Sequence, residues 1–240
     1  MKFDAVLFDC DGVLVDSEPI TNGVLREMLG ELGWHMTVQE SMSLFVGKAL
    51  KEETEMITQH TGRPVGAEWI QAFQERRNTA LRERLTAIPN IHAAIEAIHA
   101  RFDGRIACAS GADRYKVEMQ LRQVGLMAYF EGRIFSGYET PRSKPFPDVY
   151  LAAARALGVD PKRCAVVEDS VTGAQAGVAA GCTVFGFCPD ALGHSSAQAM
   201  RDAGVVQVFD DMALLPGLLG ADNTCHGLPE CGPSSNQEGD

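Results

Sequence analysis

Residues 5–13 of the chain read Ala-Val-Leu-Phe-Asp-Cys-Asp-Gly-Val, and this stretch decides the fold. The apolar run Ala5–Phe8 predicts a strand that is buried on both faces. This strand delivers Asp9 and Asp11 to a glycine-bearing turn, at the sheet edge where open parallel α/β proteins bind their ligands. Two crowded carboxylates repel each other unless a cation or a shared proton relieves them. A metal-assisted site is therefore the first hypothesis.

Beyond this strand, the sequence alternates between strand and helix patterns with one interruption. Apolar residues recur at helical spacing in 21–32, 50–61 and 67–85, and no strand pattern lies between these segments. Further strands are predicted at 105–110, 132–135, 164–167, 183–187 and 205–209, and helices at 115–124, from Pro147, at 172–180 and up to Leu219. The alternation predicts an α/β fold, a doubly wound parallel sheet with an inserted all-helical domain.

The same pattern sets the domain boundaries. We expect a core formed by residues 1–16 and 87–219, and a helical cap formed by residues 17–86. Residues 220–240 are rich in Gly, Pro, Ser, Asn and acidic residues and contain little that could be buried, so a disordered tail is expected.

Composition limits the classes of function. The 240 residues are 45% hydrophobic and 22% charged, which is enough for a sizeable core. A net charge of −11 argues against binding to nucleic acid or to an anionic membrane. No apolar run reaches membrane-spanning length and the first residues lack the pattern of a signal peptide, so a cytoplasmic protein is expected. Nothing specifies an oligomeric state, and a monomer is the simplest expectation.

Seven cysteines do not form a disulfide framework. Four lie in or beside apolar runs and are predicted to be small buried residues: Cys10, Cys108, Cys164 and Cys182. The odd count fits a reducing compartment. A structural zinc site at Cys225, His226 and Cys231 is not favoured, because no second pair of ligands follows.

Two more predicted strands are followed by residues that could take part in binding or catalysis. Ser110 and Gly111 place a hydroxyl and an unhindered amide after a strand, which suits a phosphate oxygen. The alternative for Ser110 is an ordinary turn or helix cap. Lys144 lies between turn-forming prolines just before a helix. Its alternative is a surface lysine.

A third predicted strand ends in the adjacent carboxylates Glu168 and Asp169. Such acids often cap a helix, but Ser170 could cap equally well and leave them for other work. Taken together, four strand ends supply two pairs of acids, a hydroxyl and a lysine. This inventory is the one that phosphoryl transfer requires. An EF-hand loop and a P-loop are excluded because their further ligands and spacing are missing.

This ordered set resembles the haloacid-dehalogenase-type phosphohydrolases. The resemblance is to the subgroup with a helical cap after the first strand, which includes β-phosphoglucomutase-like proteins and sugar-phosphate phosphatases. It spans about residues 3–219 and rests on the motifs at 9–17, Ser110, Lys144 and 168–169. Core stretches such as Phe135–Tyr138 are most similar to bacterial 6-phosphogluconate phosphatases.

The resemblance implies a role for each motif residue. Asp9 would attack phosphorus to form an aspartyl-phosphate, and Asp11 would act as general acid and then as general base. Lys144 would offset the negative charge, and Ser110 with the Gly111 amide would hold the phosphoryl oxygens.

The resemblance also implies a cofactor, Mg²⁺. Its ligands would be Asp9, the backbone carbonyl of Asp11 and Asp169, with Glu168 either a direct ligand or a neighbour of one. Hard oxygen ligands suit Mg²⁺ better than zinc.

The cap should determine which substrate is accepted. Lys48 and Lys51 could meet an anionic or polyhydroxylated substrate, although two solvated lysines are an equal alternative. The last cap helix carries four arginines that are predicted to form an exposed face without a role: Arg76, Arg77, Arg82 and Arg84.

The sequence thus predicts a Mg²⁺-dependent phosphatase for a small phosphorylated sugar or sugar acid, such as 6-phosphogluconate. The alternative is a β-phosphoglucomutase-like phosphomutase. Thr21 and Leu50 argue against the mutase, because they stand where that group carries a histidine and an arginine. A non-catalytic phosphate or metal sensor would be expected to lose Asp9 or Asp11, and this chain has both.

Overall fold

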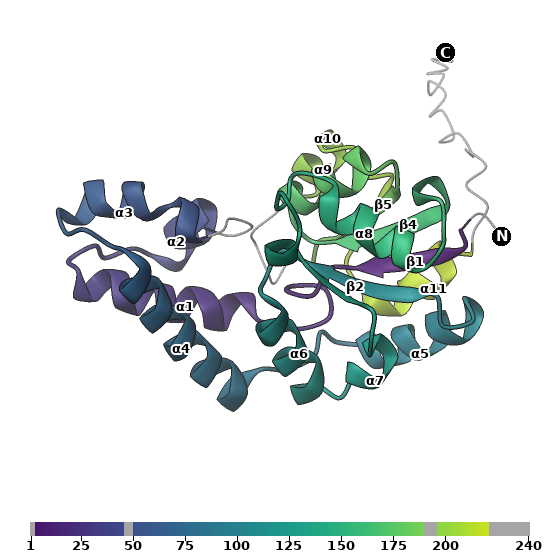
Figure 1. Cartoon of the computed structure of the whole chain (residues 1–240), viewed down its shortest axis with the longest axis horizontal. Helices are drawn as coiled ribbons and strands as arrows, with labels where there is room; N and C mark the ends of the chain where they lie inside the picture. The colour runs from purple at the N-terminus through teal and green to yellow at the C-terminus, as the bar shows by residue number, and fades with distance from the viewer. Residues whose placement is uncertain (1–2, 46–49, 190–195, 221–240) are drawn as a thin grey trace, which may run out of the picture.

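A six-stranded sheet forms the centre of the protein. The computed structural model describes residues 3–45, 50–189 and 196–220. All strand pairs in the sheet are parallel, in the order β3-β2-β1-β4-β5-β6 (Figure 1). The strands are β1 (Ala5–Phe8), β2 (Ile106–Ser110), β3 (Ile134–Ser136), β4 (Cys164–Glu168), β5 (Thr183–Phe187) and β6 (Gln207–Phe209). The predicted doubly wound parallel sheet is confirmed.

Strand β1 lies in the middle of the sheet, and its register positions the site. Phe8 is aligned with Cys108 of β2 on one side and with Val167 of β4 on the other. The residues that follow these three strands therefore emerge together at one edge. In Figure 1, β1 runs from the end marked N toward the helices α1–α4.

Alternate residues of β1 face opposite layers of helices. Val6 and Phe8 belong to one hydrophobic cluster, and Ala5 and Leu7 belong to another. The first cluster includes residues of α5 (Ile91–Arg101), α6 (Arg114–Gln123), α7 (Met127–Phe130) and α11 (Leu215–Leu218). The second includes residues of α8 (Asp148–Ala156), α9 (Val171–Ala179) and α10 (Ala197–Asp202). Figure 1 shows these two groups on opposite faces of the sheet.

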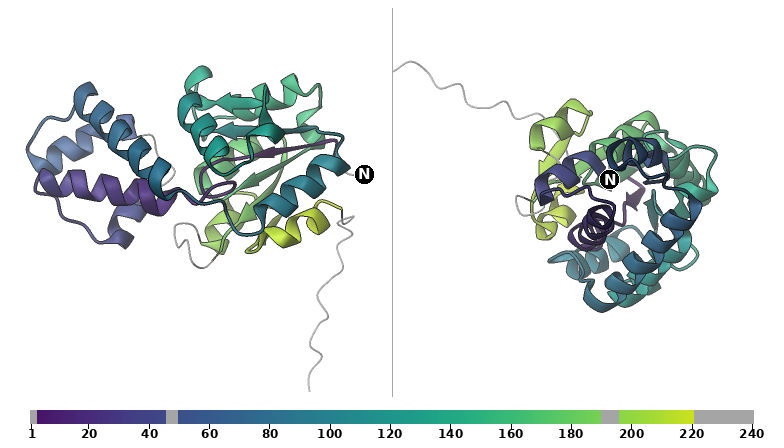
Figure 2. Two further views of the ribbon diagram at one scale, coloured as in Figure 1. Left: turned by 90° about the horizontal axis from the view of Figure 1, so that it is seen from below. Right: turned by 90° about the vertical axis from the view of Figure 1, so that its left-hand side faces the viewer.

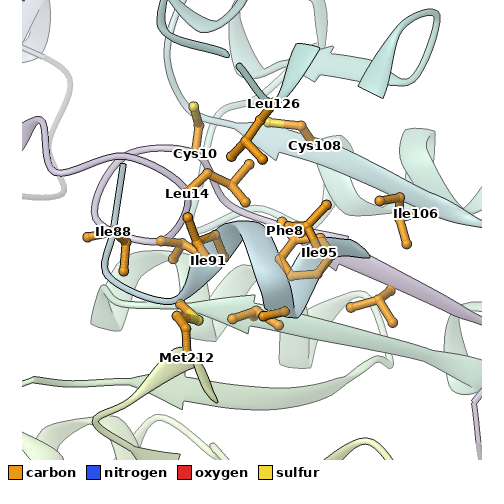
Figure 3. Close-up of a cluster of buried hydrophobic side chains, with 14 of the residues drawn as sticks. Phe8, Cys10, Leu14, Ile88, Ile91, Ile95, Ile106, Cys108, Leu126 and Met212 are labelled. Atoms are coloured by element: carbon orange, nitrogen blue, oxygen red, sulfur yellow. The ribbon is translucent and has the colours of Figure 1, made fainter. Parts of the chain in front are cut away.

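Figure 3 shows the first cluster in detail. Phe8 and Ile95 of α5 both belong to it, and the ring of Phe8 meets that of Phe130 edge to face at 6.0 Å between centroids. The four cysteines predicted to be buried are buried. Among the described residues, no helix is both long enough and apolar enough to cross a bilayer.

Between β1 and α5 the chain forms the helical insert, which comprises α1 (Glu18–Glu31), α2 (Val38–Phe45), a 3₁₀ turn (Leu50–Glu52), α3 (Thr54–Thr61) and α4 (Ala67–Arg84). The insert has a hydrophobic cluster of its own, centred on Leu25, Met28, Ile57 and Phe73. Figure 2 shows it beside the sheet and its layers of helices. The two chain crossings lie side by side, since the Asp16 amide donates to the Thr86 carbonyl at 3.0 Å.

Some elements differ from the sequence prediction. Helices α2, α5, α7 and α10 were not predicted, and the helix expected at 50–61 is a 3₁₀ turn followed by α3. Helix α2 has only eight residues, of which Ser41 and Phe45 are buried, so it is too short for its apolar spacing to stand out in the sequence. Pro147 is the N-cap of α8 and not its first residue. The expected tail lies, except for Gly220, outside the described residues, as do Lys48 and the rejected zinc ligands.

Candidate active site

The turn after β1 brings the first two acids to the edge of the sheet. Asp9 is 7% exposed and follows β1 directly. Gly12 has φ +75°, a backbone conformation that favours glycine. A Cβ atom on Gly12 would lie 1.9 Å from Oδ2 of Asp169. Glycine at this position therefore lets the carboxylate that follows β4 approach the turn.

Lys144 joins Asp9 to Glu168. Its Nζ donates to Oδ1 of Asp9 and to Oε1 of Glu168, each at 2.6 Å, and its side chain is only 9% exposed. The alternative of a surface lysine is thereby excluded. Although burial lowers the pKa of Lys144, Asp9 and Glu168 together raise it above its usual range. Lys144 is therefore protonated and forms the cationic centre of this side of the site.

The surroundings of Asp9 disfavour its charged form. Burial, and then its negative neighbours Glu168, Asp169 and Asp11, raise its pKa well above the usual range, while Lys144 acts in the other direction. The protein side chains alone thus leave Asp9 short of positive charge. A further cation beside it would favour the carboxylate form.

Glu168 is fully buried and accepts hydrogen bonds at both oxygens. Oε1 accepts from Lys144 and, at 2.7 Å, from the phenol of Tyr150. Oε2 accepts from the Asp169 amide and from both the amide and hydroxyl of Ser170, at 3.0–3.1 Å. Ser170 also caps α9, as the sequence suggested, by accepting from the amide of Gly173. These contacts make Glu168 the counter-ion of Lys144.

Asp11 is held by two residues of α6 that the sequence analysis did not identify, and by Ser17 of the predicted motif at 9–17. Lys116 Nζ lies 2.8 and 2.9 Å from its two carboxylate oxygens, and Gln120 Nε2 donates to Oδ1 at 2.8 Å. The hydroxyl of Ser17 donates to the same oxygen. Burial raises the pKa of Asp11, but Lys116 and the hydrogen bonds outweigh it and lower the pKa to about 2. The signal in the sequence was the i, i+4 spacing of Lys116 and Gln120 on a predicted helix.

A cavity of about 200 Å³ lies between this edge of the sheet and the helical insert. Its core side is formed by predicted site residues, namely Asp9, Asp11, Ser110, Gly111, Lys144 and Asp169. Ser110 is 1% exposed, and its hydroxyl accepts from the Ala112 amide at 3.1 Å. Ser110 thus makes the contact of an ordinary turn residue, which was the alternative considered for it, and it also lines the cavity. The structure therefore brings together all the site residues predicted outside the insert. Glu168 does not line the cavity itself but contacts Lys144, which does.

The insert side of the cavity corrects one prediction. Arg77 was assigned to an exposed face, but it is 8% exposed and lines the cavity. Its guanidinium contacts the side chain of Asn78 at 2.9 and 3.1 Å and Asp113 of α6 at 3.5 Å. The error arose because α4 packs against both α1 and α6, so periodicity alone did not fix its orientation. Lys51 also lines the cavity, with Nζ 4.7 Å from the ring centre of Tyr138.

The acidic cluster is suited to a divalent cation. Oxygens of Asp9, Glu168 and Asp169 lie within 4.8 Å of one another, and all three residues are buried. Together with Asp11 they are opposed by two ammonium groups, those of Lys116 and Lys144, which leaves a formal charge of −2. Hard carboxylate oxygens with this excess charge match the ligand preference of a hard divalent ion.

Comparison with known proteins identifies the family. A family model described as haloacid dehalogenase-like hydrolase matches residues 3–181. The chain belongs to this family. It is 33% identical over 190 residues to the 6-phosphogluconate phosphatase of Escherichia coli K12, a match that covers 79% of this chain and 84% of that protein.

Solved structures agree with this assignment. A haloacid dehalogenase-like protein of unknown function from Agrobacterium tumefaciens C58 superimposes with a TM-score of 0.78 at 32% identity, covering 91% of this chain and 98% of that one. A family hydrolase from Deinococcus radiodurans R1, solved with bound phosphate and sodium, gives a TM-score of 0.74 at 34% identity, covering 91% and 96%. The predictions of family, fold and enzyme class are confirmed.

Proposed function

We propose that the chain is a Mg²⁺-dependent phosphatase that hydrolyses a small phosphorylated sugar or sugar acid, such as 6-phosphogluconate, through an aspartyl-phosphate on Asp9. The observation that carries this proposal is the convergence of Asp9, Asp11, Lys144 and Asp169 on one side of a cavity of about 200 Å³. The relatives support it, since one 33% identical protein is a 6-phosphogluconate phosphatase and another, 29% identical, is a hexitol phosphatase.

In the first half of the reaction, Asp9 attacks phosphorus and the leaving oxygen departs with a proton from Asp11. Ser110 and the Gly111 amide bind the phosphoryl oxygens, and Lys144 balances charge shared by Asp9 and phosphate. Mg²⁺ would be held by Asp9, the Asp11 carbonyl and Asp169, and when bound it would supply positive charge to the transferring group.

In the second half, Asp11 accepts a proton from the water that attacks phosphorus, and Asp9 leaves as a carboxylate. Asp11 then holds the proton needed for the next leaving group. The ionised state favoured by Lys116 corresponds to the stage between these two transfers. The contacts of Glu168 favour a role beside the metal site, because both its oxygens already accept hydrogen bonds.

The helical insert, residues 17–86, would act as the cap that covers the core, residues 1–16 and 87–219, and excludes water from the reacting centre. Arg77 supports the choice of a sugar acid. It is a buried cation on the insert side, and its contact to Asp113 is long at 3.5 Å. A carboxylate on the substrate, remote from the phosphoryl group, would give this guanidinium a stronger partner. Lys51, and Lys48 outside the described residues, would add positive charge near the same substrate.

The experiment is a panel of phosphorylated metabolites that includes 6-phosphogluconate, assayed for phosphate release with Mg²⁺ and with EDTA. We expect release that depends on Mg²⁺ and that Asp9→Asn lowers by roughly 10⁴ to 10⁶ in kcat, as for other covalent nucleophiles. Undiminished release by Asp9→Asn, in protein free of contaminating phosphatase, would contradict the proposal. Isomerised sugar phosphate forming faster than free phosphate would instead identify a phosphomutase.

A further inference from the structure

Lys116 is a buried cation to which the reaction above gives no part in positioning a reacting group. It is 5% exposed, and its Nζ contacts both carboxylate oxygens of Asp11, at 2.8 and 2.9 Å. Gln120, one turn later on α6, is fully buried and donates to Oδ1 of the same carboxylate. Ser17 donates to that oxygen from the other end of the turn after β1. A carboxylate held by three donors has little freedom to rotate.

The first turn of helix α6, which carries Lys116, is itself held in place. Asp113 is the N-cap, and its Oδ1 accepts from the backbone amide of Lys116 at 2.9 Å. The other oxygen of Asp113 faces Arg77 of the insert at 3.5 Å. Val117, the next residue, is fully buried in the hydrophobic cluster that contains Val6 and Phe8 of β1. The ammonium group of Lys116 is therefore anchored to a rigid element and not to a loose surface chain.

We propose that Lys116, assisted by Gln120, is a positioning residue that fixes the Asp11 carboxylate for hydrolysis of the phosphoenzyme. The inference rests on the proposed function. In that step a water oxygen bonds to phosphorus, the bond between phosphorus and Asp9 breaks, and Asp9 leaves as a carboxylate. The proton of the water passes to Asp11. A base must lie within hydrogen-bond reach of the proton it takes, so loss of the two α6 donors would slow this step above all.

The test uses p-nitrophenyl phosphate, whose leaving group departs without a proton. With this substrate kcat/KM reports phosphorylation of Asp9, whereas kcat also reports hydrolysis of the phosphoenzyme. For Lys116→Met we expect kcat to fall about 30-fold, less than the roughly 10²- to 10⁴-fold that a general base itself contributes, and kcat/KM to change less than about threefold. Rapid mixing should show a burst approaching one p-nitrophenol per enzyme, since the phosphoenzyme accumulates.

Two further variants keep the test decisive if Lys116→Met does not fold, as judged by circular dichroism and thermal melting. Gln120→Met removes one neutral donor and should give the same pattern at about fivefold. Lys116→Arg restores a cation and should recover part of the lost kcat. The matched control is Lys162→Met, a change at an exposed lysine far along the chain, which should leave both constants unchanged.

Equal losses in kcat and kcat/KM without a burst would overturn the inference, because they would mean general damage to the site. Unchanged kinetics in Lys116→Met or, if that variant is unfolded, in Gln120→Met would also overturn it. These outcomes differ from failure of the proposed function, in which the wild-type protein itself would release no p-nitrophenol above the level of Asp9→Asn.

Discussion

The two walls of the cavity are built on different physical principles. The charged groups of the core wall are carboxylates and ammonium groups, most of them on turns that follow parallel strands, and each of Asp9, Asp11 and Lys144 is tied to a partner of opposite charge. The insert wall comes mainly from helices and combines apolar side chains such as Leu25 and Phe73 with polar ones such as Asn22. The core wall carries an ion network, whereas the insert wall mixes apolar and polar side chains.

This difference separates chemistry from selection. Charged groups in a buried network depend on one another, so a small displacement on the core wall should affect every step of the reaction. The cation of the insert wall, Arg77, pairs with Asp113 and not with Asp9 or Asp11, so exchanges on this wall should disturb those acids less. We therefore expect large effects on turnover from the core wall, and smaller effects on substrate affinity from the insert wall.

The strongest test of this contrast compares two glycines. Gly12→Ala would place a Cβ atom 1.9 Å from Oδ2 of Asp169 on a backbone with φ +75°, so we expect kcat/KM to fall about 100-fold or more. Gly23→Ala, in α1 of the insert, meets nothing within 4 Å and should leave turnover unchanged while adding roughly 0.5 to 1 kcal/mol to helix stability. Steady-state kinetics and urea unfolding measure both. Equal kinetics for the two variants would contradict the contrast.

A second test concerns stability in acid. Because the pKa of Asp11 is lowered to about 2 in the folded protein, its ionisation stabilises the fold above the unfolded pKa near 4 and stops doing so as the pH falls through about 2. The wild type should lose about 2 kcal/mol more unfolding free energy than Asp11→Asn between pH 5 and pH 2. Glu31→Gln, which removes an exposed partner of Arg76 in the insert, should follow the wild type. Parallel urea titrations at several pH values decide the matter.

A third test compares neighbouring arginines of α4. Arg77→Met removes a buried cavity cation, and we expect KM for a phosphorylated sugar acid to rise about tenfold, as for the loss of a charged hydrogen bond, with kcat nearly unchanged. Arg76→Met removes an exposed ion pair with Glu31 and should change KM less than about twofold. A tenfold loss of kcat in Arg77→Met would place this residue in the chemistry and not in selection.

The smallest expected effect is at Lys51. Its ammonium lies over the ring of Tyr138 at 4.7 Å, a contact worth about 0.5 to 1 kcal/mol at an exposed site. Lys51→Met and Tyr138→Leu should each change KM less than about fivefold, and the double variant should resemble either single one. Additive effects would show that the two side chains act separately on the substrate.

The sequence predicted the core wall well because its residues are read locally. An apolar run that ends in Asp9-x-Asp11, or in Glu168-Asp169, announces both a buried strand and the acids at its end. Parallel strand order then requires those ends to meet. The same logic indicated Lys144, since the proline-rich turn before α8 limits where that side chain can go.

The sequence could not predict the side chains of the insert wall or the hydrogen-bond donors on α6 in this way. Whether Arg77 faces solvent or a cavity depends on how α4 packs against α1 and α6, a matter of a partial turn that the helical period does not fix. Lys116 and Gln120 are ordinary polar residues of a helix until the fold places them against Asp11, more than a hundred residues earlier.

The amino-acid order by itself thus determined the parallel sheet, the edge where the cavity lies and the acids and lysine found there. Only the tertiary structure decided which oxygens those acids offer, that Glu168 is committed to Lys144, and that Asp11 is held by α6. The physical reason is the distance along the chain over which each kind of interaction acts. Strand and turn preferences act over a few residues, whereas the direction of a buried charge is set by whichever distant group can satisfy it at lowest free energy.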